Sequence, residues 1–129
     1  MKLIPFDKQD PLALQALLEL YNSWSNPEAC PKQDELPETG YIIPGLAACF
    51  LYETDSNWCF LEHAIVGHRV PGHTEAITEI VKALVADAKS LGYVKVYCQP
   101  MNEFAILRAE ACGFVKKSLP YRCQLEMEL

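Results

Sequence analysis

The segment from Thr74 to Phe114 constrains the fold of this chain more than any other part of the sequence. Apolar residues recur in its first half at steps of three and four, which is the spacing of a long amphipathic helix. These residues are Ile77, Ile80, Val81, Leu84, Val85, Ala88 and Leu91. We expect Thr74 to be the N-cap of this helix and Gly92 to end it.

The second half of the same segment predicts a strand and then a second, shorter helix. Tyr93 to Cys98 is rich in β-branched and aromatic residues, as strands are. A turn at Pro100 leads to a helix over Glu103–Ala111, and Gly113 is the expected stop. A strand on each side of the long helix would give one parallel crossover.

The first forty residues predict a helix followed by a long loop. Asp10 and Pro11 have the residue types of an N-cap and a first helical position, and the helix should end near Trp24. The stretch from Ser25 to Gly40 is polar and rich in proline, so we expect a long surface loop, with or without a helical turn.

From Tyr41 onward the pattern changes to strands. Leu46–Glu53 and Trp58–Val66 flank a turn signal and form a predicted hairpin. The segment Gly67–His73 contains two glycines and a proline and should be a loop. Final strands are expected at Phe114–Lys117 and Tyr121–Leu129.

The order of these elements predicts a single α/β (α+β) domain over residues 1–129. Its sheet should be mixed and mostly antiparallel, flanked by helices, with the one parallel strand-helix-strand crossover. The net charge of −6 argues against binding to nucleic acid, which requires a basic face. No apolar run approaches the ~20 residues needed to span a membrane.

The remaining composition points to a reducing compartment. Met1–Lys8 has no long apolar run and is unlike a signal peptide. The six cysteines form no Cys-x-x-Cys pair, and we expect them to be reduced thiols in a cytoplasmic protein. His63, His68 and His73 lie five residues apart, a spacing that does not align on one helix face, so we expect no metal site.

The stretch that begins at Asn102 resembles a recognisable part of the GNAT acetyltransferases. In that family an Asn is followed by Ala three residues later, by an aromatic residue (usually Tyr) seven later, and by Gly-Phe eleven and twelve later. The corresponding residues here are Asn102, Ala105, Ala109, Gly113 and Phe114. The resemblance covers roughly Ala47 to the C-terminus, with the first helix in a consistent position.

The resemblance implies an N-acetyltransferase that uses acetyl-CoA as co-substrate and in which an amine attacks the thioester directly. The family's diphosphate loop reads Arg/Gln-x-x-Gly-x-Gly/Ala, and the segment at 67–76 departs from it. Pro71 lacks an amide donor, and Glu75 places a negative charge in the first helical turn. The cofactor-binding residues we expect are Ile65, Val66, Gly67, Arg69, Gly72, His73, Thr74, Asn102 and Ala105.

The resemblance also directs attention to the strand before that loop as the source of a catalytic base. Alternation would put Phe60, Glu62, Ala64 and Val66 on one face and Cys59, Leu61, His63 and Ile65 on the other. Glu62 is the first choice for the base, because a carboxylate within an apolar strand must face water, a partner or a site. A solvated Glu62 and a buried, hydrogen-bonded His63 are the structural alternatives.

The proton donor to the leaving thiolate is less direct to assign. Ala109 stands where the family often has Tyr, and alanine cannot donate a proton. Tyr97 is the candidate substitute, with Tyr121 as a second, and a packing role is the alternative for both. Cys98 and Cys112 would serve as nucleophiles only with an activating base, of which the sequence gives no sign.

The acceptor would enter through the first half of the chain, where the acidic loop suits a cationic amine of a small molecule or protein. A solvated loop explains the same charges. Two functions therefore remain: an acetyltransferase, which we favour, or a GNAT fold without catalysis that regulates a protein partner. A homodimer is compatible with either.

Overall fold

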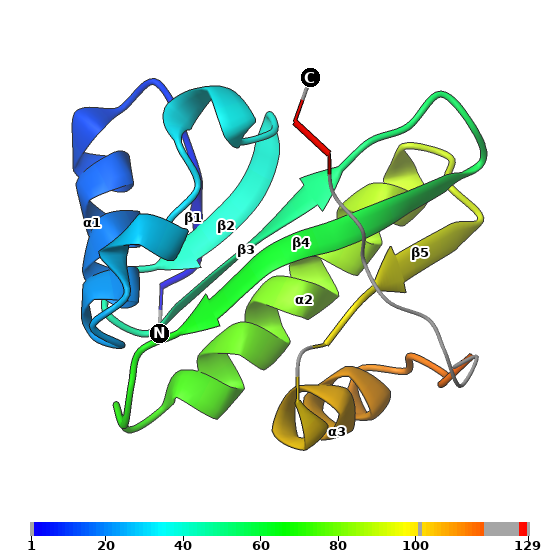
Figure 1. Cartoon of the computed structure of the whole chain (residues 1–129). Coiled ribbons are helices and arrows are strands. Elements are labelled where there is room, and N and C mark those ends of the chain that lie inside the picture. Colours follow the sequence, from blue (N-terminus) through cyan, green and yellow to red (C-terminus); the bar gives the residue numbers. More distant parts are fainter. Residues whose placement is uncertain (1, 101, 118–126, 129) are drawn as a thin grey trace.

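The computed structural model describes residues 2–100, 102–117 and 127–128, and its core is one mixed sheet (Figure 1). The strands are β1 (Ile4–Pro5), β2 (Thr39–Ile43), β3 (Ala47–Tyr52), β4 (Trp58–Val66) and β5 (Lys95–Cys98). They lie side by side in this order. All neighbours are antiparallel except β4 and β5, which are parallel. The expected mixed sheet with one parallel crossover is confirmed.

Three helices accompany the sheet: α1 (Pro11–Asn22), α2 (His73–Ser90) and α3 (Glu103–Ala111). α1 and α2 pack on opposite faces, as Figure 1 shows, and each face has its own core. α2 buries Ile80 and Leu84 against β3 and β4, whereas α1 buries Leu17 and Leu20 against β2 and β3. α3 buries none of its side chains fully. No helix in the described ranges has the length and apolarity to cross a bilayer.

The ends of the helices follow the residues predicted for them, with one exception. The Asp10 side chain accepts a hydrogen bond from the Leu12 amide, and Asn102 caps α3 in the same way. α2, however, begins one residue before the expected cap: Gly72 is the N-cap, at φ +88°, and Thr74 lies inside the first turn. The prediction for Thr74 was wrong because a glycine with left-handed backbone ends the loop earlier.

Two further differences concern strands. β1 was not predicted, because two residues that include Pro5 give no periodic signal. The strand expected at Phe114–Lys117 is wrong, since residues 114–117 have no regular secondary structure. The strand expected at Tyr121–Leu129 lies outside the described residues, except for positions 127 and 128.

A β-bulge in β4 changes the predicted alternation of its side chains. Ala48 is paired with Ile65 and Phe50 with Glu62. Between these two pairs, β4 contains one more residue than β3. His63 lies in the extra stretch with φ +56°. Beyond the bulge the faces are exchanged: Val66 packs in the α2 core and Ile65 in the α1 core, opposite to the prediction.

Candidate functional site

The sheet splits where β5 ends. β4 and β5 are paired from Trp58–Lys95 to Leu61–Cys98, and β4 then continues to Val66 with β3 on one side but no described strand on the side of β5. This stretch of β4 therefore presents an open edge of backbone N–H and C=O groups. An extended ligand could pair with such an edge as a strand would.

At the end of this edge the direction of the backbone groups can be assigned. The Gly67 amide donates to the Leu46 carbonyl, 2.8 Å away, and so points toward β3. Neighbouring residues in a strand point their hydrogen-bonding groups to opposite sides, so the groups of Val66 face the open edge. The Val66 carbonyl already has a partner, because the Trp24 indole Nε1–H donates to it at 2.6 Å.

The same tryptophan connects the end of α1 to the loop after β4. The rings of Trp24 and His68 lie 4.2 Å apart between centroids. The His68 amide also donates to Ser23 Oγ at 3.0 Å, whereas His68 Nδ1 is buried and has no hydrogen-bond partner among the described residues. The residue pattern around Trp24 carries no signal for these contacts with the loop.

The loop leads directly to the N-terminus of α2, which has no side-chain cap. Gly72 is exposed, and a Cβ built on it would meet no atom within 4 Å. Uncapped N–H groups and the helix dipole make such a terminus suited to an anion. Arg69 is exposed in the same loop at φ +55°, and Glu75 brings the opposing charge in the first turn.

Gly67 is required by space at the junction of β4 and this loop. A Cβ there would lie 2.6 Å from the Gly45 carbonyl oxygen and 2.8 Å from Val70 Cγ2. Only glycine lets the loop approach the turn between β2 and β3 this closely. Because the Gly67 amide is used internally, the open edge offers the Val66 amide as the donor at this end.

Glu62 and His63 lie where the split begins, immediately after the last β4–β5 pair. Glu62 is paired with Phe50 on the α1 side of the sheet. The bulge turns the His63 ring to the same side, with its centroid 5.8 Å from that of Tyr52. The prediction that the two side chains face opposite ways was wrong, because alternation fails at the left-handed backbone of His63.

Aromatic side chains cover the sheet beside these two residues. Tyr52 and Phe60 stack with centroids 5.4 Å apart, and Trp58 lies 6.1 Å from Phe60. Tyr97 meets Trp58 edge-on at 5.5 Å. Tyr97 is thus on the same side of the sheet as Glu62, one β5 residue before the split. Of these four aromatic residues, only Tyr97 was predicted to take part in catalysis.

The cysteines near the split are not activated as nucleophiles. Burial raises the pKa of Cys98, and the nearby Cys112 and Glu62 raise it further. Burial likewise raises the pKa of the Cys112 thiol, against a smaller opposite effect of Lys82. All five cysteines in the described ranges are free. A cysteine nucleophile would require a lowered pKa, so the surroundings of these two thiols do not support one.

The residues expected at the start of α3 are engaged in helix capping. Asn102 Oδ1 accepts a hydrogen bond from the Ala105 amide at 2.9 Å. Ala109 is half-buried in the same helix, and Phe114 packs on the α2 core. The assignment of Asn102 and Ala105 to the cofactor stays a prediction. Both residues lie at the start of α3, the helix that follows β5 along the chain.

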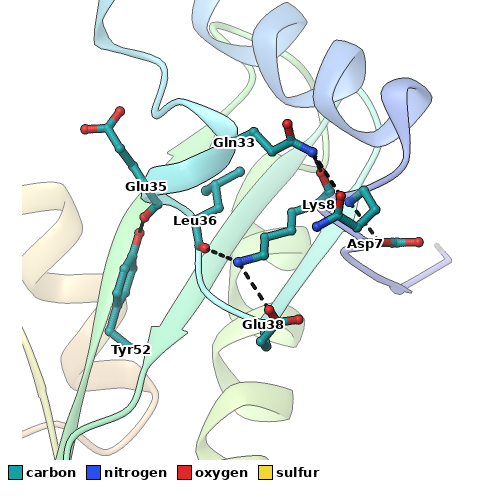
Figure 2. Close-up of polar contacts among 8 residues, drawn as sticks. Asp7, Lys8, Gln33, Glu35, Leu36, Glu38 and Tyr52 are labelled. Atoms are coloured by element: carbon teal, nitrogen blue, oxygen red, sulfur yellow. Dashed lines mark hydrogen bonds and ion pairs between the residues drawn. The ribbon is translucent and has the colours of Figure 1, made fainter.

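The acidic loop between α1 and β2 is fixed by polar contacts, which Figure 2 shows. Lys8 Nζ donates to the Leu36 carbonyl at 2.9 Å and forms an ion pair with Glu38 at 3.2 Å. Tyr52 donates its hydroxyl hydrogen to the Glu35 carbonyl at 2.8 Å.

A hollow of about 370 Å³ lies between this loop and α1, but none of its lining residues comes from β4, β5 or α2. Among the residues described, no three His, Cys, Asp or Glu side chains gather as metal ligands.

Several solved structures that the chain matches in fold are named acetyltransferases. The chain matches the glucosamine-6-phosphate N-acetyltransferase of Arabidopsis thaliana with a TM-score of 0.68 and 15% identity, over 97% of this chain and 98% of that one. It matches a structure named a "probable acetyltransferase" with a TM-score of 0.72 and 15% identity, over 99% and 100%. An acetyltransferase of Trypanosoma brucei gives 0.64 and 16%, over 96% and 99%.

No family model and no curated protein sequence matches the chain. The likeness to these structures is one of fold, and it extends over nearly the whole chain. The chain therefore shares the fold of these acetyltransferases, which is the kind of fold that the resemblance at Asn102–Phe114 implied.

Proposed function

We propose that the protein is an N-acetyltransferase that takes acetyl-CoA as its acetyl donor. The observation that carries this proposal is the split between β4 and β5, with the uncapped N-terminus of α2 at the end of the open edge. An extended pantetheine arm could pair with the edge, and its diphosphate would lie at the helix N-terminus. The shared acetyltransferase fold supports the same reading.

The chemistry assigned to this site is direct transfer. The amine nitrogen attacks the thioester carbonyl carbon, and the Val66 amide stabilises the negative charge that develops on the oxygen. Glu62 accepts the amine proton, directly or through water. When the carbon–sulfur bond breaks, Tyr97 supplies a proton to the thiolate. Glu62 and Tyr97 both lie on the α1 side of the sheet, beside the split.

Isothermal calorimetry with acetyl-CoA tests the proposed cofactor site. We expect saturable binding to the unmodified chain, and its loss in Gly72→Glu, because a carboxylate would meet the diphosphate at the start of α2. Gly72→Ala is the matched control: it imposes a side chain at the same φ of +88° without adding charge. It should bind acetyl-CoA far more tightly than Gly72→Glu.

Absence of binding at millimolar acetyl-CoA would refute the proposal. Equal affinities in the two Gly72 variants would mean that the diphosphate lies elsewhere. Transfer itself is measured by release of free CoA thiol with a panel of primary amines. Binding of acetyl-CoA without release on any amine would leave a CoA-binding protein and contradict the catalytic part of the proposal.

A further inference from the structure

Four aromatic side chains form a continuous row across three neighbouring strands on the α1 side of the sheet. We call Tyr52, Phe60, Trp58 and Tyr97 the aromatic row. Each ring contacts the next, with centroid distances of 5.4, 6.1 and 5.5 Å. The three contacts are stacked, tilted and edge-on in turn, so the row presents both ring faces and ring edges.

The outer half of the row is accessible. α1 packs over the β2 and β3 side of this face and buries Phe50 there. Trp58 and Tyr97, on β4 and β5, are each 39% exposed. Two large adjoining aromatic side chains exposed on a sheet face indicate a ligand-binding surface.

The charge beside the row is negative at the end next to the split. Glu62 follows Phe60 on the same face of β4. Burial raises the pKa of Tyr52 to about 12, and the carboxylates of Glu62 and Glu35 raise it as well. Lys95, the β5 partner of Trp58, lies at the opposite end of the row. A ligand with one positive charge therefore fits best with that charge toward Glu62.

We infer that the aromatic row binds a primary amine whose ammonium group is joined to an aromatic ring by a short aliphatic chain. The ring would lie against Trp58 and Tyr97, and the ammonium group would point toward Glu62. Cation–π contact with the row and attraction to the carboxylate then favour the charged amine over a neutral analogue. This inference rests on the proposed function in one respect: the amine is taken to be the acetyl acceptor.

The dimensions of the row agree with such a ligand. Trp58 and Glu62 lie four positions apart in β4, and four positions span about 13 Å along an extended strand. This length accommodates an aromatic ring, a short aliphatic chain and an ammonium group. The amine end would reach Glu62 at the start of the split, where the acetyl group is proposed to be presented.

Amine binding can be measured independently of acetyl transfer. Calorimetric titrations would use tryptamine, its neutral analogue 3-ethylindole, and spermidine as a flexible amine without a ring. Each is titrated with and without saturating CoA. We expect tryptamine to bind in at least one of these conditions, and to bind about 10-fold more tightly than either comparison compound.

Two variants locate the site. Trp58→Leu removes an exposed ring from the row and should weaken tryptamine about 10-fold, and Glu62→Gln should reduce the preference over 3-ethylindole. The matched control is Phe104→Leu, which replaces a 76% exposed aromatic residue on α3 and should leave tryptamine binding unchanged. The inference is overturned if tryptamine binds in neither condition, if spermidine binds equally well, or if Trp58→Leu has no effect.

The outcome separates this inference from the proposed function. Tryptamine bound at the row by a protein that ignores acetyl-CoA would refute the acetyltransferase and retain the amine site. Acetyl-CoA turnover with aliphatic amines alone would retain the acetyltransferase and refute the aromatic amine.

Discussion

At the scale of single residues, His63 is the most informative position in the chain. It is neither glycine nor asparagine, yet its φ is +56° in the middle of a strand. Residues of this kind in left-handed conformation are uncommon and tend to mark functional sites. Here the conformation produces the bulge and brings the His63 ring to the side of Glu62 and Tyr52.

Two replacements of His63 separate the backbone from the side chain. Both His63→Asn and His63→Val remove the ring from Tyr52, but asparagine tolerates positive φ and a β-branched residue does not. We expect His63→Val to unfold with a free energy about 1 to 2 kcal/mol lower than His63→Asn, as measured by urea denaturation. Equal stabilities would show that the bulge relaxes and does not impose its φ on residue 63.

The bulge also marks the limit of what the residues of β4 could predict. The alternation of apolar residues from Cys59 to Leu61 gives the faces correctly. Nothing in the residue types reveals that one extra residue follows, because the left-handed position is occupied by histidine and not by glycine. The predicted faces of Ile65 and Val66 were therefore exchanged.

At the scale of the elements, helices were predictable and contacts between distant elements were not. The helical period of α2 depends only on its own sequence and was predicted correctly. The same holds for the N-caps Asp10 and Asn102 and for Gly92, the left-handed residue at which α2 stops. β1 exists only through its pairing with β2, and its two residues carry no local signal. The bond from Trp24 to Val66 joins residues 42 positions apart and depends on tertiary packing.

That bond between α1 and β4 can be tested directly. Trp24→Phe keeps an aromatic ring over His68 but removes the donor to the Val66 carbonyl. We expect the free energy of unfolding to fall by about 1 kcal/mol, the usual value of such a hydrogen bond. Phe104→Leu on α3 is the control, with a change within about 0.5 kcal/mol. A Trp24→Phe protein as stable as the unmodified chain would refute a structural role for the bond.

At the scale of the whole molecule, several weak acids are kept neutral by the fold. Burial raises the pKa of Cys49 to about 12. Hydrogen bonding to Asp87 raises the pKa of Tyr41 to about 12, and burial does the same for Tyr52. Each group has a lower pKa in the unfolded chain, so the unfolded state ionises first as the pH rises. Their stabilisation is present below about pH 9 and is lost as the pH approaches 12.

Urea denaturation between pH 8 and pH 10.5 measures this effect. We expect the free energy of unfolding to fall steadily above pH 9. In Tyr41→Phe the fall should be shallower, because one of the groups with a raised pKa can no longer ionise. A free energy that stays constant or rises over this range would contradict the raised pKa values.

The whole molecule also determines where ligands can bind. The resemblance at Asn102–Phe114 was enough to predict the fold, and the structure confirms it as a mixed sheet with one parallel pair. Both strands of that pair end where the residue pattern predicted, at Val66 and at Cys98, but their register was not predictable. Cys98 lies opposite Leu61, so β4 continues past the end of β5. The open edge arises from this offset, and the central claim is that it binds acetyl-CoA.

Amide hydrogen exchange followed by mass spectrometry tests that claim most directly. With saturating acetyl-CoA, we predict slower exchange over residues 62–67 of β4 and its loop, and in the first turn of α2. The amides of β1 and β2 should exchange as they do in the free protein. Unchanged exchange at 62–67, or protection confined to the hollow between α1 and residues 27–33, would contradict the account.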